Sequence, residues 1–203
     1  VREAATEMLK DKERFKDCPN YQHDIADVVR QTLTDSTYYL IKDIAASYEK
    51  KDMEAFKAQY TTFLGILGDL NRLLSQVGLF RLEKWTSSAR NICDEVPGTT
   101  EADRDWMEGN ARTLITVWGP EQCAEKGKLH DYSSRQWGGM LNDFYLARWE
   151  MFFKALEEGK TISSPEWFKW EENWTRSKTI TKVAEENPVD VACELYDKYF
   201  SKQ

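Results

Sequence analysis

The sequence has few of the side chains that bind metals. Its 203 residues include two isolated histidines, His23 and His130. Four cysteines are spread along the chain without a CxxC pair: Cys18, Cys93, Cys123 and Cys193. Because a zinc site needs clustered Cys and His ligands, we expect no metal site. We interpret the cysteines as scattered thiols, since a disulfide, although possible in a secreted protein, cannot be assigned from this spacing.

Long apolar runs and blocks of basic residues are also absent. No apolar stretch approaches the roughly 20 residues that cross a bilayer, and we expect no signal peptide within these residues. The formal net charge is −7, and the charges alternate in sign as they do on solvated helix faces. Since phosphate binding needs a basic patch, we expect neither a membrane nor a nucleic acid as a partner.

The motifs of common catalytic and nucleotide-binding sites are missing. The sequence contains no GxxxxGK[ST], GxGxxG, HExxH or GxSxG. Its 35 acidic residues make carboxylate pairs easy to propose, but a glycosidase needs one pair held at a defined separation. Nothing singles out such a pair, and we interpret Glu171 and Glu172 as a solvated or capping pair. The residues themselves therefore predict no catalytic group and no cofactor.

Aromatic residues, in contrast, are abundant: eight Trp, nine Tyr and nine Phe. They can fill a core without metals or disulfides, and apolar residues recur at helical spacing along nearly the whole chain. The clearest stripe comprises Phe56, Tyr60, Phe63, Leu67, Leu70, Leu74 and Val77. We predict an all-α fold, a bundle of roughly seven helices joined by short loops, in a single domain over residues 1–203. Residues 1–20 are expected to be the tail of a preceding helix or a linker, with the natural N-terminal part missing.

Several helix boundaries can be read from turn residues. A fourth helix is expected to start at a Thr99 or Thr100 cap and to run through Trp118 to Gly119-Pro120. A fifth is expected to begin near Trp137, and Ser163 with Pro165 should start a sixth that carries Trp167, Trp170 and Trp174. Gly65 and Gly68 lie inside the Phe56–Val77 stripe, which predicts close approach of another backbone there.

Segment 109–153 is unusually rich in polar and aromatic residues for one helix–loop–helix turn. One interpretation is that Arg112 and Arg148 are buried, paired guanidinium groups and that the tryptophans belong to the core. The other is that the loop after Trp118 lines a concave surface that contacts a sugar. Trp and Tyr suit the apolar face of a pyranose, while Asp, Gln and Arg can bind its hydroxyl groups.

Three pieces of this segment carry a resemblance to a known family. They are residues 110–120 (NARTLITVWGP), 129–137 (LHDYSSRQW) and 143–149 (DFYLARW). Together they resemble the C-terminal domain of the α-N-acetylglucosaminidases, family 89 of the glycoside hydrolases. Residues 24–31, 69–74, 85–90, 170–174 and 189–192 extend the resemblance over nearly the whole chain.

The resemblance implies a function and partners. Family members remove terminal α-linked N-acetylglucosamine from glycans, using two glutamates of a catalytic barrel that this chain does not contain. The chain alone is expected to be inactive and to pack on the barrel of the same polypeptide as one wall of its pocket. The resemblance also implies a location outside the cytoplasm, either secreted or periplasmic in bacteria or lysosomal in animals.

The same resemblance assigns candidate residues. Trp118, Leu129 and Tyr132 are expected to face the glycan. The expected supports of that wall are Arg112, Asp131, Gln136, Trp137 and Arg148. A free-standing helical module that binds a glycan or a protein is the alternative. An independent enzyme that uses its own carboxylates is a third possibility.

Overall fold

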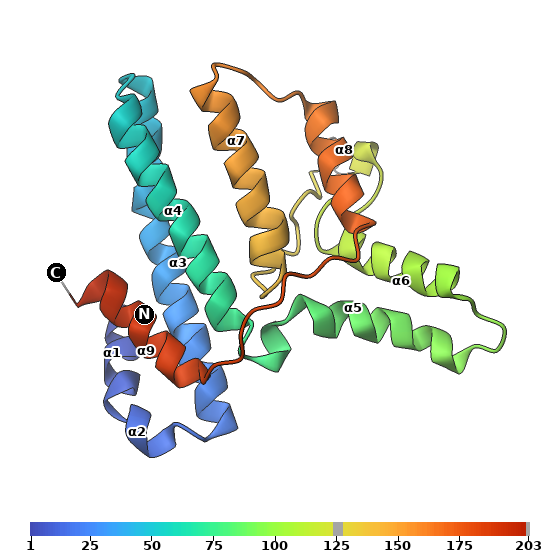
Figure 1. Cartoon of the computed structure of the whole chain (residues 1–203), viewed down its shortest axis with the longest axis horizontal. Helices are drawn as coiled ribbons and strands as arrows, with labels where there is room; N and C mark the ends of the chain where they lie inside the picture. The colour runs from blue at the N-terminus through green and yellow to red at the C-terminus, as the bar shows by residue number, and fades with distance from the viewer. Residues whose placement is uncertain (124–127, 202–203) are drawn as a thin grey trace.

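The computed structural model describes residues 1–123 and 128–201 and consists of helices, as predicted (Figure 1). In the described part of the chain the only β-type pairing is an isolated bridge between Arg81 and Gly138. The α-helices are α1 (Arg2–Lys10), α2 (Lys12–Phe15), α3 (Pro19–Glu49), α4 (Met53–Leu74), α5 (Leu82–Asn91), α6 (Glu101–Leu114), α7 (Ala147–Glu157), α8 (Ser164–Thr175) and α9 (Pro188–Phe200). A π-helix, η4 (Leu141–Leu146), leads directly into α7, and 3₁₀ turns cover Gly78–Phe80 (η1) and Ile92–Glu95 (η2).

Helix starts follow the caps that the sequence offers. At α6 the Thr100 hydroxyl accepts a hydrogen bond from the Asp103 amide while the Asp103 carboxylate accepts one from the Thr100 amide. Ser163 and Glu166 form the same reciprocal box at α8, with Pro165 in the first turn. Each box supplies acceptors for two amide groups that a helix N-terminus otherwise leaves without partners. The helix starts predicted at Thr100 and Ser163 are therefore confirmed.

The main core lies between the long antiparallel pair α3–α4 and the helices α7 and α9 (Figure 1). Phe56 and Phe63 of α4 meet Phe153 of α7 with ring centroids 5.9 and 6.1 Å apart. A second cluster joins α5, α6, η4 and α8 through Leu82, Ile115, Met140, Phe144 and Trp174. Helix α1 packs against this framework, with Ala5 fully buried.

The boundaries predicted for the domain and for its first 20 residues stay predictions.

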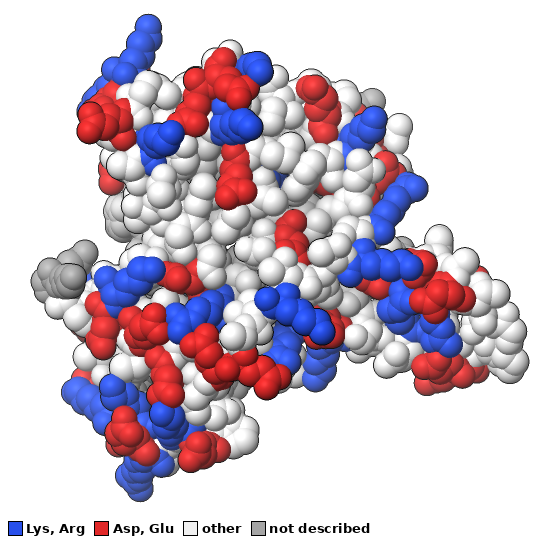
Figure 2. All heavy atoms as spheres, in the orientation of Figure 1, with Lys and Arg blue, Asp and Glu red and all other residues white. Residues whose placement is uncertain are grey.

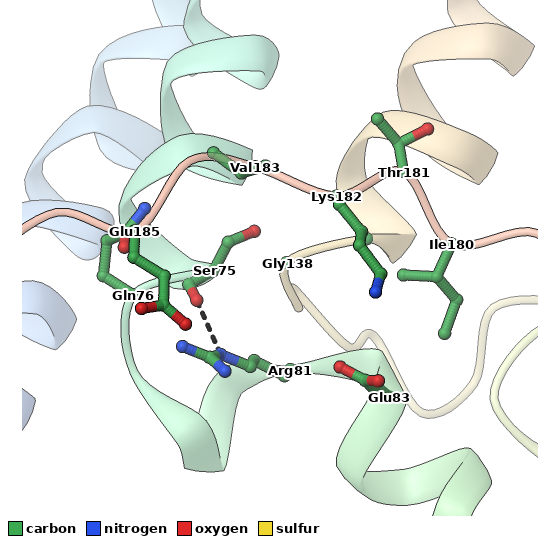
Figure 3. Close-up of a pocket in the computed structure, with 11 residues that line it drawn as sticks. Ser75, Gln76, Arg81, Glu83, Gly138, Ile180, Thr181, Lys182, Val183 and Glu185 are labelled. Carbon is green, nitrogen blue, oxygen red and sulfur yellow. Dashed lines mark hydrogen bonds between the residues drawn. The ribbon is translucent and has the colours of Figure 1, made fainter.

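An extended segment, residues 176–187, connects α8 to α9 across the end of α4 (Figure 1). Arg72 of α4 holds it by donating to both carboxylate oxygens of Glu186, at 2.6 and 2.8 Å. A pocket of about 170 Å³ remains beneath the segment, lined by Arg81, Lys182 and Glu185 among others (Figure 3). There the Arg81 side chain donates from Nε to the Ser75 carbonyl oxygen at 2.6 Å.

Charge is distributed as the sequence suggests. On the face drawn in Figure 2, acidic and basic side chains are interspersed and form no large area of one sign. None of the described helices is both long enough and apolar enough to span a bilayer. Over the same residues no three Cys, His, Asp or Glu side chains are grouped so that they could hold a metal ion. All four cysteines are free thiols.

Two helix boundaries differ from the prediction. Helix α6 ends at Leu114, not near Trp118, because the β-branched residues Ile115, Thr116 and Val117 follow and disfavour helix. The next helix begins after Met140, not near Trp137, since two glycines intervene and Gly139 has φ +89°. Both differences lengthen the connection that carries the candidate wall residues.

The expectation for Gly65 and Gly68 is wrong. A Cβ atom at Gly65 would meet nothing within 4 Å, and one at Gly68 would meet only the Leu146 side chain, at 3.9 Å. The close backbone approach occurs instead at Gly138, where a Cβ atom would lie 2.6 Å from the Ser75 amide nitrogen. Gly138 thereby lets the loop after Trp137 lie directly on the end of α4.

This difference gives a paired prediction. Gly138→Ala is expected to lower the free energy of unfolding by about 1–3 kcal/mol, because backbone atoms must move to admit the methyl group. Gly65→Ala is expected to raise it by up to about 1 kcal/mol, since it lies in an open stretch of helix interior. Urea unfolding of both variants measures the difference. Equal effects would contradict the close contact at Gly138.

Candidate functional site

The connection between α6 and η4 has an unusual backbone. In the described residues five non-glycine positions have positive φ, and four of them are Trp118, Lys128, Asp131 and Ser134. Such conformations cost on the order of 1–3 kcal/mol each and persist only where surrounding contacts enforce them. The described part of the connection, residues 115–123 and 128–140, is therefore held in a defined shape.

Two of the predicted wall residues meet at the surface of this connection. The rings of Trp118 and Tyr132 lie edge to face, with centroids 5.5 Å apart and planes at 70°. Trp118 is 37% and Tyr132 69% exposed. The third, Leu129, is half-buried, and its carbonyl oxygen accepts a hydrogen bond from the Tyr132 amide at 3.1 Å. The structure thus brings the three residues together; that they contact a glycan stays a prediction.

Main-chain hydrogen bonds fix this group to the end of α6. The Trp118 amide donates to the Thr113 carbonyl oxygen at 2.7 Å, and the Asp131 amide donates to the Thr116 carbonyl oxygen at 2.9 Å. The two ends of the loop are therefore joined beside α6. We call residues 116–123 and 128–134, the described part of this turn, the wall loop.

Behind the wall loop lies a cluster of charged side chains from three elements. Arg148 of α7 donates to Asp131 of the loop at 2.6 Å and to Glu171 of α8 at 2.7 Å. The other oxygen of Glu171 lies 2.7 Å from Nε2 of His130. Only 1% of the Glu171 side chain is exposed. The cluster helps to line a pocket of about 510 Å³ whose other walls include Trp149, Phe152, Ile162 and Trp167.

The interpretation of Glu171 and Glu172 as a solvated or capping pair is wrong for Glu171. Glu172 is partly exposed and bonds Arg176 one turn away, as expected of a solvated acid. Glu171 instead faces the interior. The sequence contained a signal for this, because Glu171 lies four residues after Trp167 and three before Trp174, on the aromatic face of its helix. His130, also thought isolated, is 41 positions from its partner, and no local pattern connects the two.

The remaining support residues do not belong to this cluster. Arg112 is fully buried; its Nε and Nη2 donate to one oxygen of Glu108, and its guanidinium lies 4.8 Å from the ring centre of Trp174. The Gln136 side-chain oxygen accepts from Arg30 of α3 at 2.8 Å. Trp137 packs on Trp85 of α5 with ring centroids 5.9 Å apart. Arg112 is buried and both guanidinium groups are paired, as the first interpretation of segment 109–153 predicts, although Arg148 is only half-buried. Trp118 is exposed, so that interpretation does not hold for every tryptophan.

The charged cluster makes one pH-dependent prediction. Bonding to Glu171 raises the pKa of His130 above its usual value, so the protonated imidazole is favoured in the folded chain. A raised pKa stabilises the fold fully below the unfolded value of about 6.5, and this stabilisation is lost as pH rises through the folded value. His130→Gln should therefore cost about 1 kcal/mol of unfolding free energy near pH 5.5 and less near pH 8.5. Urea unfolding of the parent chain and the variant at both pH values tests this prediction. A larger loss of unfolding free energy at pH 8.5 than at pH 5.5 would contradict it.

The chain is similar to known proteins over almost its entire length. The family model described as the alpha-N-acetylglucosaminidase (NAGLU) C-terminal domain matches residues 1–198. Human alpha-N-acetylglucosaminidase is 25% identical over 194 residues, which are 91% of this chain and 25% of the human protein.

Solved structures give the same result. A family 89 glycoside hydrolase from Clostridium perfringens in complex with PUGNAc superimposes with a TM-score of 0.87 at 30% identity, covering 98% of this chain and 23% of that one. The enzyme from the same organism with its substrate GlcNAc-α-1,4-galactose gives 0.85 at 30% identity, covering 97% and 23%. This chain thus spans about a quarter of the length of these relatives. The chain belongs to the family of α-N-acetylglucosaminidase C-terminal domains of the family 89 glycoside hydrolases.

Proposed function

We propose that this chain is the non-catalytic helical part of an enzyme that removes terminal α-linked N-acetylglucosamine from a glycan. In that enzyme it packs on the catalytic barrel of the same polypeptide, and the wall loop forms one side of the pocket that holds the sugar. The observation that carries the proposal is the exposed Trp118–Tyr132 pair, presented on a loop of enforced backbone shape. Aromatic faces of this kind suit the apolar side of a pyranose.

The buried carboxylates of the chain support a non-catalytic role. Glu108 and Glu171 are the two buried acids among the described residues. Glu108 is held between Arg112 and Arg90, and Glu171 between Arg148 and His130. Both side chains are buried and each contacts two cationic or imidazole partners within the chain. These contacts support a structural rather than a catalytic role for the two acids.

The relatives support the substrate class. The human protein is named for N-acetylglucosaminidase activity, and the bacterial enzyme was solved with GlcNAc-α-1,4-galactose. We extend to this chain the same class, a glycan ending in α-linked N-acetylglucosamine. We also propose a location outside the cytoplasm or in the lysosome, where such glycans are degraded.

Binding to the barrel tests the first part of the proposal. The chain exposes large apolar side chains that a partner domain could cover, among them Tyr38, Tyr39 and Leu79. We expect the isolated chain to form a one-to-one complex with the separately produced barrel in analytical ultracentrifugation. A free-standing glycan- or protein-binding module, the alternative function, would leave the two proteins separate.

A further inference from the structure

The unusual backbone conformation of the wall loop requires contacts that hold it in place. Trp118, Lys128, Asp131 and Ser134 all have positive φ, between 46° and 68°. Main-chain bonds to Thr113 and Thr116 hold the two ends of the turn, and side-chain contacts behind the loop supply further support. The structure places one buried carboxylate, Glu171, where it can contribute to that support.

Both oxygens of Glu171 are connected to the loop. Oε2 lies 2.7 Å from His130 Nε2, which is a direct link. Oε1 accepts from Arg148 Nη1 at 2.7 Å, and Nη2 of the same guanidinium donates to Asp131 Oδ2 at 2.6 Å, which is a link through one residue. Glu171 thus holds two consecutive loop residues, 130 and 131, immediately before Tyr132.

The intervening arginine is itself immobilised. The Arg148 guanidinium lies 4.9 Å from the ring centre of Phe144 and 5.2 Å from that of Tyr145. Only 19% of its side chain is exposed. Stacking on aromatic faces and two charge-assisted bonds leave it little freedom, so it transmits the position of Glu171 to the loop.

We propose that Glu171 is a positioning residue of the sugar-contacting wall: it clamps His130 and, through Arg148, Asp131, and thereby sets where Tyr132 and Trp118 stand. The consequence for the enzyme rests on the proposed function, whereas the clamp itself is a property of this chain. Glu171 is not a catalytic residue, because it acts through its partners.

The neighbouring acid supplies a matched control. Glu171→Gln keeps the side-chain shape but removes the negative charge that faces His130 and Arg148, while Glu172→Gln removes the same charge from the partly exposed Arg176 pair. Hydrogen–deuterium exchange on the chain reports the clamp directly. We expect protection in residues 128–134 to fall at least about tenfold in Glu171→Gln, with α3 and α4 unchanged, and no change in Glu172→Gln.

A second variant guards against simple unfolding. Asp131→Asn weakens only the last link, at a side chain that is 32% exposed, and should loosen the same segment without disturbing the bundle. Unchanged loop protection in both Glu171→Gln and Asp131→Asn would overturn the clamp. Equal loosening in Glu172→Gln would also overturn it.

Kinetics of the complete enzyme separate the clamp from the wall function. We expect Glu171→Gln to raise KM about tenfold with a smaller change in kcat, because a displaced wall loses contact with bound sugar. Glu172→Gln should leave both constants unchanged. A loop that loosens while KM stays constant would support the clamp but contradict the proposed wall, so the two failures can be told apart.

Discussion

Replacing Arg112 by leucine is expected to lower the free energy of unfolding by about 3 kcal/mol. The guanidinium is fully buried, makes two hydrogen bonds to Glu108 and stacks on Trp174. Its loss leaves a carboxylate that is 7% exposed, and Arg90 is then its one charged partner among the described residues. For a chain of this length the loss corresponds to a decrease in Tm of about 6–12 °C.

A second Glu–Arg pair with the same spacing serves as the control. Arg176 bonds Glu172 four residues earlier, as Arg112 bonds Glu108, but 72% of the Arg176 side chain is exposed. An exposed pair of this kind contributes about 0.3–0.5 kcal/mol. Calorimetry should therefore show a large loss of stability in Arg112→Leu and almost none in Arg176→Leu. Comparable effects would mean that burial is not what makes the first pair important.

The second large effect concerns activity. In the complete enzyme, Trp118→Ala should reduce kcat/KM for an aryl α-N-acetylglucosaminide by about 10- to 100-fold, because burying an aromatic ring against a ligand contributes about 1.5–3 kcal/mol. Tyr132→Ala should act in the same direction, since its ring supports Trp118 edge to face at 5.5 Å. Steady-state kinetics measure both variants.

Trp106 is the matched control for Trp118. It is also an exposed tryptophan, at 68%, but it lies on α6 and outside the wall loop. Trp106→Ala should leave kcat/KM within about twofold of the parent enzyme. If Trp106→Ala were as damaging as Trp118→Ala, exposed aromatics in general would matter and the wall loop would have no special role.

Local sequence signals predicted the fold well because helices depend on contacts a few residues apart. The caps at Thr100 and Ser163 are both present in the structure, each with its side-chain hydrogen bond. The boundary at Trp118 was misplaced because apolar spacing outweighed the β-branched run at 115–117. Spacing alone does not report how strongly each residue tolerates helix.

The candidate site was only partly predictable. Trp118 and Tyr132 are predicted through the family resemblance, and the structure places their rings in contact. Glu171 and His130 were missed since their importance depends on a contact between residues 41 positions apart. The sequence groups Arg112 with Arg148 as supports of one wall, yet Arg112 pairs with Glu108, whereas Arg148 pairs with Glu171 and Asp131. Long-range pairing of charges leaves no periodic signal in one sequence.

Turnover of a chromogenic α-N-acetylglucosaminide tests the central claim most directly. The chain would be assayed alone, the barrel alone, and the two mixed. The proposed function predicts no turnover by the chain and a marked increase in the activity of the barrel when the chain is added. Turnover by the chain alone, or a barrel whose activity the chain does not change, would contradict it.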